Sequence, residues 1–275
     1  MNETNPQHLL KQLENYFFTY LDAGICIAYS GGVDSTLLLR AALNAALPQK
    51  KPVLALILET RLHPHKDTLE ALSLARSLGA MCEVISIDEF QDPQIRQNPE
   101  NRCYLCKRLL FRTLKERAAF LGFTVIADGT NADDLREYRP GLAALEELGV
   151  HSPLKELGIT KQEVREISAF LGLSTASKPS TPCLATRLPY HTLLDYSVLE
   201  RIQQGEELLR AMGFYNVRLR FHEPVLRIEV DTADFPKLLE RTGEICAKLK
   251  ALGFLYITLD LEGFRSGSMD IGLKL

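Results

Sequence analysis

Residues 25–46 read ICIAYSGGVDSTLLLRAALNAA, which is an apolar run, a glycine pair and a helical stretch in direct succession. The apolar run at 25–29 is typical of a buried strand, and residues 36–46 are typical of a helix. A glycine-rich turn between such elements lets backbone N–H groups face an anion, and the start of the helix adds its positive dipole end. This stretch therefore predicts a phosphate-binding loop.

The side chains of this loop suggest separate roles. Gly31 and Gly32 permit the turn, while Ser30 and Ser35 add hydroxyl donors. Asp34 would repel a phosphate, so we expect it to hold Mg²⁺ or to orient the loop. The stretch lacks the Gly-Lys-Ser/Thr ending of a Walker A loop. The alternative is a Gly-Gly turn that merely joins a strand to a helix.

The pattern around the loop predicts an α/β fold. Apolar runs expected as strands alternate with helical stretches of 10–18 residues, at strands 53–58, 83–87 and 124–127 and helices 9–20, 65–78 and 104–121. Such alternation is typical of a parallel sheet covered by helices on both faces. The turn at 130–134 follows the last of these strands, where open α/β sheets bind ligands, although it also suits a helix cap.

The order of elements changes in the last third of the chain. After helices at 142–148 and 161–171, the second with a Thr160/Glu163 capping box, a proline-containing loop runs over 174–189. Beyond it we expect helix 196–212, strands 217–221 and 226–230, helix 235–249 and strand 256–261. We therefore divide the chain into a domain over 1–180 and a smaller α+β domain over 181–275.

Composition limits the possible partners and location. The 275 residues include 32 Lys and Arg against 35 Asp and Glu, which gives a net charge of −3. A generic nucleic-acid coat needs a large positive surplus, so nucleic acid is not the expected partner. No stretch approaches the ~18 apolar residues of a membrane span, and the N-terminal stretch lacks a signal-peptide pattern. We expect a cytoplasmic protein.

The six cysteines fall into two groups. In the cytoplasm they do not predict disulfides. Cys26, Cys82 and Cys246 stand among apolar residues and are expected to be buried. Cys103 and Cys106 form a CxxC pair at the start of a helix, between Arg102 and Lys107, where positive charge favours thiolates. The sixth cysteine, Cys183, lies in the proline-containing loop.

Three kinds of site fit the CxxC pair. It suits a redox dithiol, although the thioredoxin-like context is absent. It suits half of a zinc site, completed by His63 or His65. It also suits a [4Fe-4S] cluster in which Cys183 supplies a third thiolate and one iron stays open to carry substrate or sulfide.

Two resemblances connect these motifs to known families. The string SGGVDS resembles the PP-loop of the N-type ATP pyrophosphatases, which implies ATP cleavage between the α- and β-phosphates and AMP transfer to an acceptor oxygen. The strings KPSTPCLATRLPY, VRLRFH with RIEV, and TLDLEGFRSGSM resemble the LarE family of ATP-dependent sulfur transferases. The second resemblance spans nearly the whole chain.

The LarE resemblance implies a reaction, cofactors and partners. A carboxylate of pyridinium-3,5-biscarboxylic acid mononucleotide is adenylated with Mg²⁺ and ATP and converted to a thiocarboxylate, in nickel-pincer nucleotide synthesis. One kind of member sacrifices a single cysteine, at the position of Cys183, which ends as dehydroalanine. This chain resembles the other kind, in which Cys103, Cys106 and Cys183 would hold a [4Fe-4S] cluster loaded by sulfide or a sulfur donor. The resemblance also implies a homo-oligomer.

Arginines near the C-terminus are expected at the substrate. Arg218 and Arg220 alternate along a strand and share one face, and Arg forks suit phosphate and carboxylate. The resemblance implies phosphate contacts for both and an active-site role for Arg265. Arg187, four residues after Cys183, is a further candidate. The alternative for the strand arginines is ion pairing with nearby acids, Glu223 or Glu229.

Other residues have weaker signals. Glu206 and Asp231 are placed by the resemblance near the substrate pocket, where acids can hold a divalent metal, and His222 adjoins the arginine strand. Each also suits an ordinary structural role. Three other functions stay open: sacrificial single-turnover transfer from Cys183, a PP-loop tRNA thiolase, and a non-catalytic protein that binds nucleotide and zinc.

Overall fold

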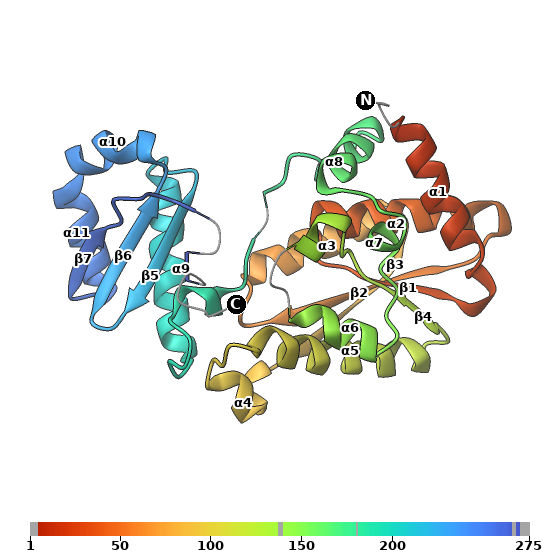
Figure 1. The fold of residues 1–275 in the computed structure, drawn as a ribbon, viewed down its shortest axis with the longest axis horizontal. Helices are drawn as coiled ribbons and strands as arrows, with labels where there is room; N and C mark the ends of the chain where they lie inside the picture. Colours follow the sequence, from red (N-terminus) through yellow and green to blue (C-terminus); the bar gives the residue numbers. More distant parts are fainter. Residues whose placement is uncertain (1–4, 137–139, 180, 266–267, 270–275) are drawn as a thin grey trace. The chain divides into compact units, whose positions relative to one another are not determined.

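The computed structural model describes residues 5–136, 140–179, 181–265 and 268–269, and Figure 1 colours them along the chain. They form two compact units. The first contains Met1–Gln91 and Asn101–Thr181, and the second contains Asp92–Glu100 and Pro182–Leu275. The second unit thus includes the short segment 92–100, which interrupts the first unit in the sequence. A single boundary near residue 180 cannot describe this arrangement.

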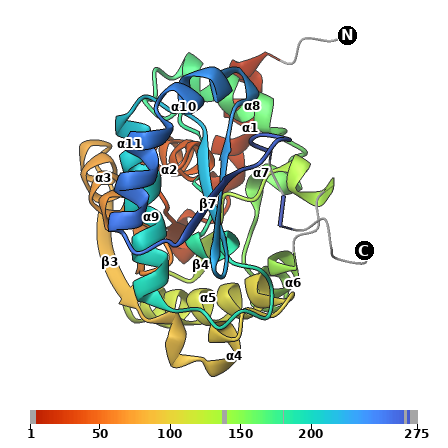
Figure 2. The same cartoon turned by 90° about the vertical axis from the view of Figure 1, so that its left-hand side faces the viewer.

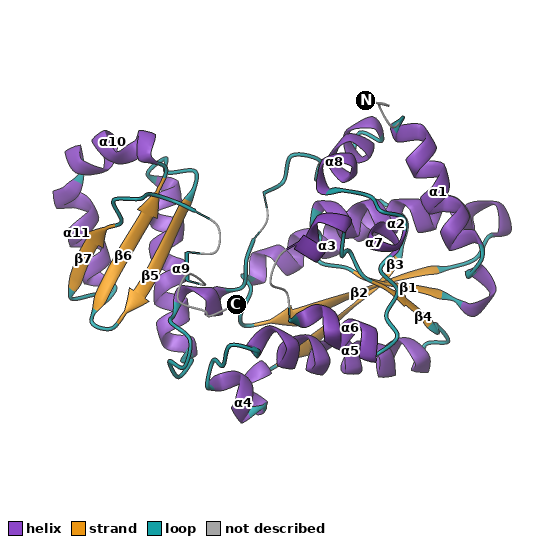
Figure 3. Ribbon diagram, in the orientation of Figure 1, coloured by secondary structure: helices purple, strands orange, loops and turns teal. Residues whose placement is uncertain are grey.

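The first unit has a four-stranded sheet in the order β3-β2-β1-β4, shown in orange in Figure 3. All three pairings are parallel. The strands are β1 (Ile25–Ala28), β2 (Val53–Thr60), β3 (Met81–Ile87) and β4 (Val125–Ala127). The predicted α/β fold with a parallel sheet is confirmed.

Alternate residues of the strands face two different layers of helices. Ile25 and Ile27 belong to one core, with α1 (Pro6–Phe18), α2 (Val33–Ala46) and α8 (Lys161–Phe170). Cys26 belongs to a second core, with α5 (Arg102–Phe120) and α6 (Gly141–Glu147). Each fully buried Ile or Leu contributes roughly 1.5–3 kcal/mol. Burial on both faces explains why these strands are continuous apolar runs.

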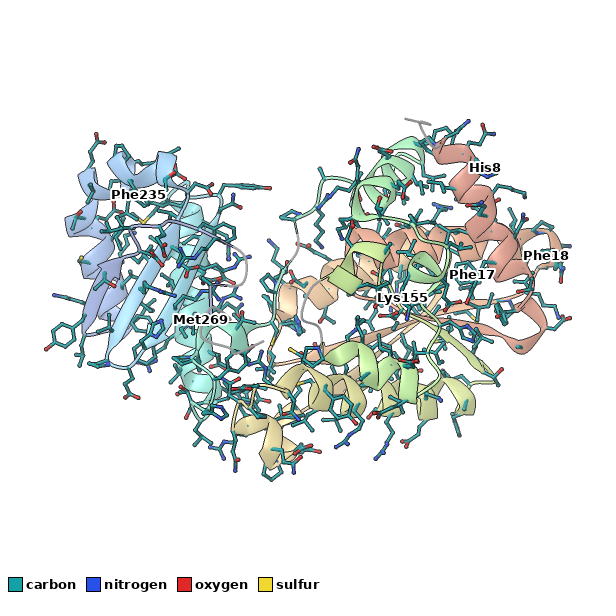
Figure 4. All side chains as sticks on the ribbon, viewed as in Figure 1. His8, Phe17, Phe18, Lys155, Phe235 and Met269 are labelled. Carbon is teal, nitrogen blue, oxygen red and sulfur yellow. The ribbon has the colours of Figure 1, made fainter. Side chains whose placement is uncertain are left out.

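Helix α1 shows how an amphipathic pattern becomes one side of this core. Asn5 caps the helix with a 2.9 Å bond from the Gln7 amide to its side chain, and a proline begins the helix. Phe17 is fully buried and Phe18 is 52% exposed, and Figure 4 labels both side chains. Adjacent residues on a helix point in different directions, so only one of the two phenylalanines packs in the core.

The helix boundaries differ from the prediction at the phosphate loop. Helix α2 begins at Val33, three residues before the predicted start at Thr36. Asp34 and Ser35 therefore lie in its first turn, where backbone N–H groups have no partner within the helix. In α8 the predicted capping box between Thr160 and Glu163 is present. Two short helices were not predicted, α4 (Pro93–Arg96) and α7 (Pro153–Glu156); α3 (His65–Ser77) was.

The second unit contains a three-stranded sheet in the order β5-β6-β7. Its elements are α9 (Tyr196–Ala211), β5 (Val217–His222), β6 (Val225–Val230), α10 (Phe235–Glu240), α11 (Thr242–Ala251) and β7 (Tyr256–Leu259). Figure 2 shows α9 and α11 together on one side of the strands. A Cβ at Gly205 of α9 would lie 2.5 Å from Leu219 and 3.1 Å from Leu249. A larger residue at this position would require these leucine side chains to shift.

The single helix predicted over 235–249 is wrong, because two helices occupy this stretch. Arg241 breaks the helical path with φ −104° and ψ 14°. Its Nη1 donates to the Met212 carbonyl at 2.9 Å, and the Thr242 hydroxyl donates to the Leu239 carbonyl at 2.7 Å. Side-chain bonds to the backbone compete with the helical ladder, so the chain turns at this point.

The segment 92–100 is held in the second unit by its backbone. The His191 amide donates to the Asn98 carbonyl and the Leu194 amide to the Arg96 carbonyl, both at 2.8 Å. The Asn98 side chain donates to the Pro189 carbonyl at 2.7 Å. These bonds fix a segment that has little regular structure of its own. Among the described residues, no helix is both long and apolar enough for a bilayer span.

Candidate functional site

The phosphate loop lies at the carboxyl end of β1, the edge where open parallel sheets bind ligands. Gly31 has φ +69°, and a Cβ there would lie 2.8 Å from the Cβ of Ala71. Gly129, after β4, packs as closely, because a Cβ there would lie 3.0 Å from that of Asp34. Gly31 is thus needed for the conformation of the loop, and Gly129 is needed because the segment after β4 packs closely against the loop.

Among the described residues, the hydroxyls of the loop form hydrogen bonds of 3.1–3.4 Å. Ser30 Oγ lies 3.1 Å from Ser35 Oγ, and Ser35 Oγ donates to the Gly32 carbonyl at 3.3 Å. The Gly32 amide donates to Ser30 Oγ at 3.4 Å. Such bonds are easily exchanged for better ones. These donors, together with the start of α2, can rearrange around an anion.

Beside the loop lies a cavity of about 460 Å³. It is lined by the end of β1, the loop, two lysines and the segment after β4, namely Ala28, Ser30, Asp34, Ser35, Lys107, Phe111, Lys161 and residues 128–131, 133 and 134. The predicted turn at 130–134 thus contributes to the cavity. It also makes the local bonds of a turn, since the Asn131 amide donates to Asp134 at 2.9 Å.

Asp34 is held by two groups in this cavity. The Lys161 ammonium bonds to Oδ2, and the Asn131 side chain donates to Oδ1 at 3.3 Å. Lys161 begins α8, where its own amide donates to Asp133 at 2.8 Å. The Lys161 ammonium neutralises a carboxylate of the kind that can also serve as a ligand of a divalent cation. Lys161 was not predicted from the sequence, although the capping box at Thr160 marks its place at a helix start.

Asp128 forms a second acidic point of the cavity. Its oxygens accept hydrogen bonds from the hydroxyls of Thr130 at 2.6 Å and Ser152 at 2.7 Å. Lys107 Nζ lies 3.5 Å from Oδ2, and the same ammonium lies 5.6 Å from the ring centroid of Phe111. Lys107 directly follows Cys106, so one helix, α5, carries both the CxxC pair and a wall of the cavity.

The thiols differ in exposure. Cys103 is exposed, and Cys106 is partly buried. They lie one turn apart at the start of α5, where Arg102 Nη2 lies 3.9 Å from Cys103 Sγ. Cys26 is buried as predicted, and burial raises the pKa of its thiol to about 12. The prediction of burial is wrong for the two others, Cys82 and Cys246, which are partly exposed.

The donors for a metal site divide between the two units. Cys103 and Cys106 belong to the first unit and Cys183 to the second. Within the ranges that the structure describes, no three Cys, His, Asp or Glu side chains form a metal-binding group. The two histidines considered for zinc have other partners: His63 Nδ1 lies 2.9 Å from Thr60, and His65 Nδ1 2.7 Å from Glu59. The thiolate chemistry of the three cysteines fits an iron–sulfur cluster.

Cys183 lies on a loop that a buried arginine supports. It directly precedes a short 3-10 helix, Leu184–Arg187. Arg187 is 1% exposed, and its Nη1 donates to the carbonyls of Pro182 at 3.2 Å and Cys183 at 3.3 Å. Arg187 pairs with Glu206 through Nε at 2.8 Å and Nη2 at 3.1 Å. Arg187 thus fixes the backbone that carries the thiol.

Glu206 is the acceptor at the centre of this support. It is 2% exposed, and it also accepts from the Leu219 amide at 3.1 Å and from Arg210 at 2.8 Å. Burial acts to raise the pKa of this carboxyl, but the charge and hydrogen bonds of Arg187 outweigh burial and lower it. Its oxygens therefore serve protein donors in this structure.

The two strand arginines have different surroundings. Arg220 is buried, pairs with Glu229 at 3.1 Å and donates to the Thr186 carbonyl at 2.8 Å. The alternative of an ion pair with Glu229 is thus present at Arg220. In the part of the chain that the structure describes, Arg218 forms no ion pair; it donates to the Val217 carbonyl at 2.8 Å and lies over the Phe264 ring. Burial and the neighbouring Arg187 charge lower the pKa of Arg218 to about 10.

The remaining candidates lie near this sheet. Arg265 pairs with Glu262, and this hydrogen bond raises the pKa of the guanidinium. Asp231 accepts from Asn216 at 3.0 Å. Burial lowers the pKa of His222, whose Nε2 is buried without a partner in the described residues. Two further side chains extend the network, since Arg227 donates to Glu229 at 3.1 Å and to Met269 Sδ at 3.7 Å; Met269 is labelled in Figure 4.

Comparisons with known proteins agree with this architecture. The family model for NAD synthase matches residues 6–111. The structure of NMN synthetase from Francisella tularensis superposes with a TM-score of 0.53 at 21% identity, covering 65% of this chain and 76% of that one. These matches show the fold of the first unit.

Several relatives match over nearly the whole chain. An uncharacterized protein of Synechocystis is 40% identical over 95% of this chain and 98% of its own length. The pyridinium-3,5-bisthiocarboxylic acid mononucleotide synthase of Lactiplantibacillus plantarum is 35% identical over 90% of this chain and 88% of its own. Both matches extend from the phosphate loop through the cysteine loop and the arginine strands. The chain therefore belongs to the LarE family and is an ATP-using sulfurtransferase that forms AMP and pyrophosphate.

Proposed function

We propose that this protein adenylates a carboxylate of pyridinium-3,5-biscarboxylic acid mononucleotide and replaces its oxygen with sulfur, as a step in nickel-pincer nucleotide synthesis. The 35% identity to the synthase of Lactiplantibacillus plantarum supports this substrate. The observation that carries the proposal is that one chain contains both a phosphate-loop cavity and a thiol loop fixed by a buried arginine. The first suits activation by ATP, and the second suits delivery of sulfur.

In the first step a substrate carboxylate oxygen attacks the α-phosphorus of ATP. The bond from that phosphorus to the β-bridging oxygen breaks, and pyrophosphate leaves with the electron pair. The amides of Gly31, Gly32 and the first turn of α2 are placed to stabilise the charge on the phosphates. Asp34 is placed to bind Mg²⁺, after which the Lys161 ammonium can move from Asp34 to a phosphate oxygen.

In the second step a sulfide sulfur attacks the acyl carbon of the adenylate. The bond from this carbon to the AMP oxygen breaks, AMP leaves with the electron pair, and the sulfide proton passes to solvent. The product is a thiocarboxylate. Adenylation is needed because a carboxylate oxygen is a poor leaving group, whereas AMP is a good one. Arg187 contributes by holding the Cys183 carbonyl, so the thiol starts from a fixed backbone.

The arginine strand suits the phosphate of the substrate. Arg218 is half-buried and has no ion pair among the described residues, so an incoming anion can bind it directly. Arg220 and Arg187 already have carboxylate partners and lie close enough to add to the positive potential around it. Arg265, paired with the exposed Glu262, can exchange this partner for the substrate.

We assign Cys103, Cys106 and Cys183 as the thiolates that hold a [4Fe-4S] cluster. When bound, such a cluster supplies an open iron on which sulfide can be carried, so the protein is not consumed. The presence of two further accessible thiols on α5 favours this assignment over sacrificial donation from Cys183 alone. Sacrificial transfer stays the second candidate because Cys183 has the same fixed loop in either case.

Metal analysis of protein purified without oxygen tests the assignment. About four irons with matching acid-labile sulfide per chain are expected, and Cys103→Ala, Cys106→Ala and Cys183→Ala should each lose them. Cys246→Ala is the matched control, since this thiol is also partly exposed, and it should keep the iron. Zinc or no metal in the wild type, with loss of one sulfur from Cys183 after turnover, would instead establish the sacrificial route.

A further inference from the structure

The segment between α8 and α9 is mostly loop, shown in teal in Figure 3, and it carries Cys183. Before it leaves the first unit, one of its side chains reaches back to the phosphate loop. Lys178 Nζ donates to the Gly31 carbonyl at 3.2 Å and lies 3.5 Å from Glu70 Oε2 of α3. The steps proposed above make no use of Lys178.

The backbone around Lys178 is fixed as well. Arg165 of α8 donates through Nη1 to the Ala176 carbonyl at 2.6 Å and through Nη2 to the Lys178 carbonyl at 3.1 Å. The Lys178 amide donates to the Thr175 carbonyl at 2.9 Å. The lysine is therefore held at both ends, by its backbone on α8 and by its ammonium on the loop.

The Gly31 carbonyl is a sensitive point of the loop. This carbonyl and the Gly32 N–H belong to one planar trans peptide, in which the two groups point in opposite directions. Glycines on both sides leave this peptide free to rotate. In the structure the Gly32 amide donates only a long bond of 3.4 Å, to Ser30 Oγ. A cation bound to the Gly31 carbonyl therefore keeps the Gly32 N–H pointing away from the cation. In this orientation the N–H can donate to an anion.

We propose that Lys178 is a positioning residue that couples occupation of the phosphate loop to the segment carrying Cys183. Cys183 follows Lys178 by five positions, a reach of at most about 17 Å. When nucleotide fixes the orientation of the Gly31–Gly32 peptide, it also fixes the carbonyl that Lys178 binds. Lys178 in turn holds the start of the segment that carries Cys183. The coupling is reciprocal, so nucleotide should stabilise this segment against local opening, and the closed segment should strengthen nucleotide binding. The inference rests on the proposed use of Cys183.

The test compares Lys178→Met with Lys178→Arg and with a matched control. Lys66→Met removes the other lysine on Glu70, at 3.7 Å, and leaves the Gly31 carbonyl untouched. Full-length protein is titrated with a non-hydrolysable ATP analogue and Mg²⁺ in a calorimeter. Lys178→Met should weaken binding about 3–10-fold, the net contribution of one typical intramolecular hydrogen bond, because Lys178 acts on the nucleotide only through the Gly31 carbonyl. Lys178→Arg should recover most of the affinity, and Lys66→Met should match the wild type.

Hydrogen exchange of peptides covering 174–187 gives the second readout. Bound nucleotide should slow exchange there in the wild type and in Lys66→Met, and it should have no effect in Lys178→Met at an equally saturating concentration. Equal affinity and equal protection in Lys178→Met would overturn the inference, as would a wild type whose segment does not respond to nucleotide. Protection without any thiocarboxylate product would instead contradict the proposed function and leave the coupling standing.

Discussion

The two charged regions of the molecule are built differently. In the phosphate-loop cavity, Lys161 meets Asp34 with about a third of the lysine side chain and a fifth of the carboxylate exposed. In the second unit, Arg187 meets Glu206 with both side chains 2% exposed. A partly exposed pair exchanges partners at little cost, whereas a buried pair is costly to break. The first region is thus suited to exchange ligands, and the second to hold a loop in place.

Arg218 is the exception within the second region. Its neighbours Arg187 and Arg220 each have a carboxylate partner, but Arg218 has none among the described residues. Burial disfavours its charge, as the lowered pKa of about 10 shows. A half-buried cation without a carboxylate in direct contact gains from binding an anion. In the second unit, Arg218 is therefore the arginine that is suited to bind a ligand.

Breaking the buried pair should give the largest effect. Glu206→Gln leaves Arg187 charged and without a counter-charge, so the free energy of unfolding should fall by about 3–5 kcal/mol in denaturant titrations. The pKa of Glu206 is lowered in the fold, so its stabilisation is present above the unfolded pKa and is lost as pH falls through the folded one. The variant should lack this acid dependence. Glu244→Gln, in an exposed pair with Arg241, is the control and should show no measurable change; equal stability of the two variants would contradict the contrast.

Altering the exchangeable pair should affect activity more than stability. Asp34→Asn should slow AMP formation about 10²–10³-fold, because the developing charge on the phosphates loses its metal. Lys161→Met should weaken binding of ATP, because the phosphates lose a cation, while the melting temperature stays close to that of the wild type. Lys11→Met, an exposed lysine paired with Glu14 on α1, is the control. A large loss of stability without loss of activity in Lys161→Met would show that the pair is structural.

Substituting Arg218 and Arg220 should distinguish an arginine that binds substrate from one that stabilises the fold. Arg218→Met should keep the fold and weaken binding of the mononucleotide substrate about 10–100-fold, the range for losing a hydrogen bond to a charged group. Arg220→Met should instead destabilise the unit, because it leaves the buried Glu229 with fewer partners. Calorimetric titration of both variants, with melting curves, tests this difference. The same loss of stability in both would remove Arg218 from the substrate site.

The smallest expected effect concerns Glu89 in the first unit. Its carboxyl is 1% exposed with Oε2 unpartnered in the described residues, and burial raises its pKa. A raised pKa means that the folded state holds the proton more tightly, so stability falls as pH rises from the unfolded pKa to the folded one. Glu89→Gln should therefore gain about 1 kcal/mol at pH 8 and little at pH 4. A loss of stability at pH 8 would show that the carboxylate is needed in its charged form.

Local sequence signals predict the elements but not the contacts between distant ones. The phosphate loop, the parallel sheet and the Thr160 capping box follow from patterns within a few residues. The pairing of Arg187 with Glu206, and of Lys161 with Asp34, joins residues 19 and 127 positions apart. The place of 92–100 in the second unit likewise depends on backbone bonds to residues 189–194.

The central claim is most directly tested by following sulfur into product. Anaerobic protein is supplied with Mg²⁺, ATP, sulfide and pyridinium-3,5-biscarboxylic acid mononucleotide, and AMP and thiocarboxylate are counted against protein by mass spectrometry. We expect one AMP for each oxygen replaced by sulfur, many turnovers per chain, and an intact Cys183 thiol. AMP formation that stops after one thiocarboxylate per chain, with Cys183 converted to dehydroalanine, would contradict the cluster-based account.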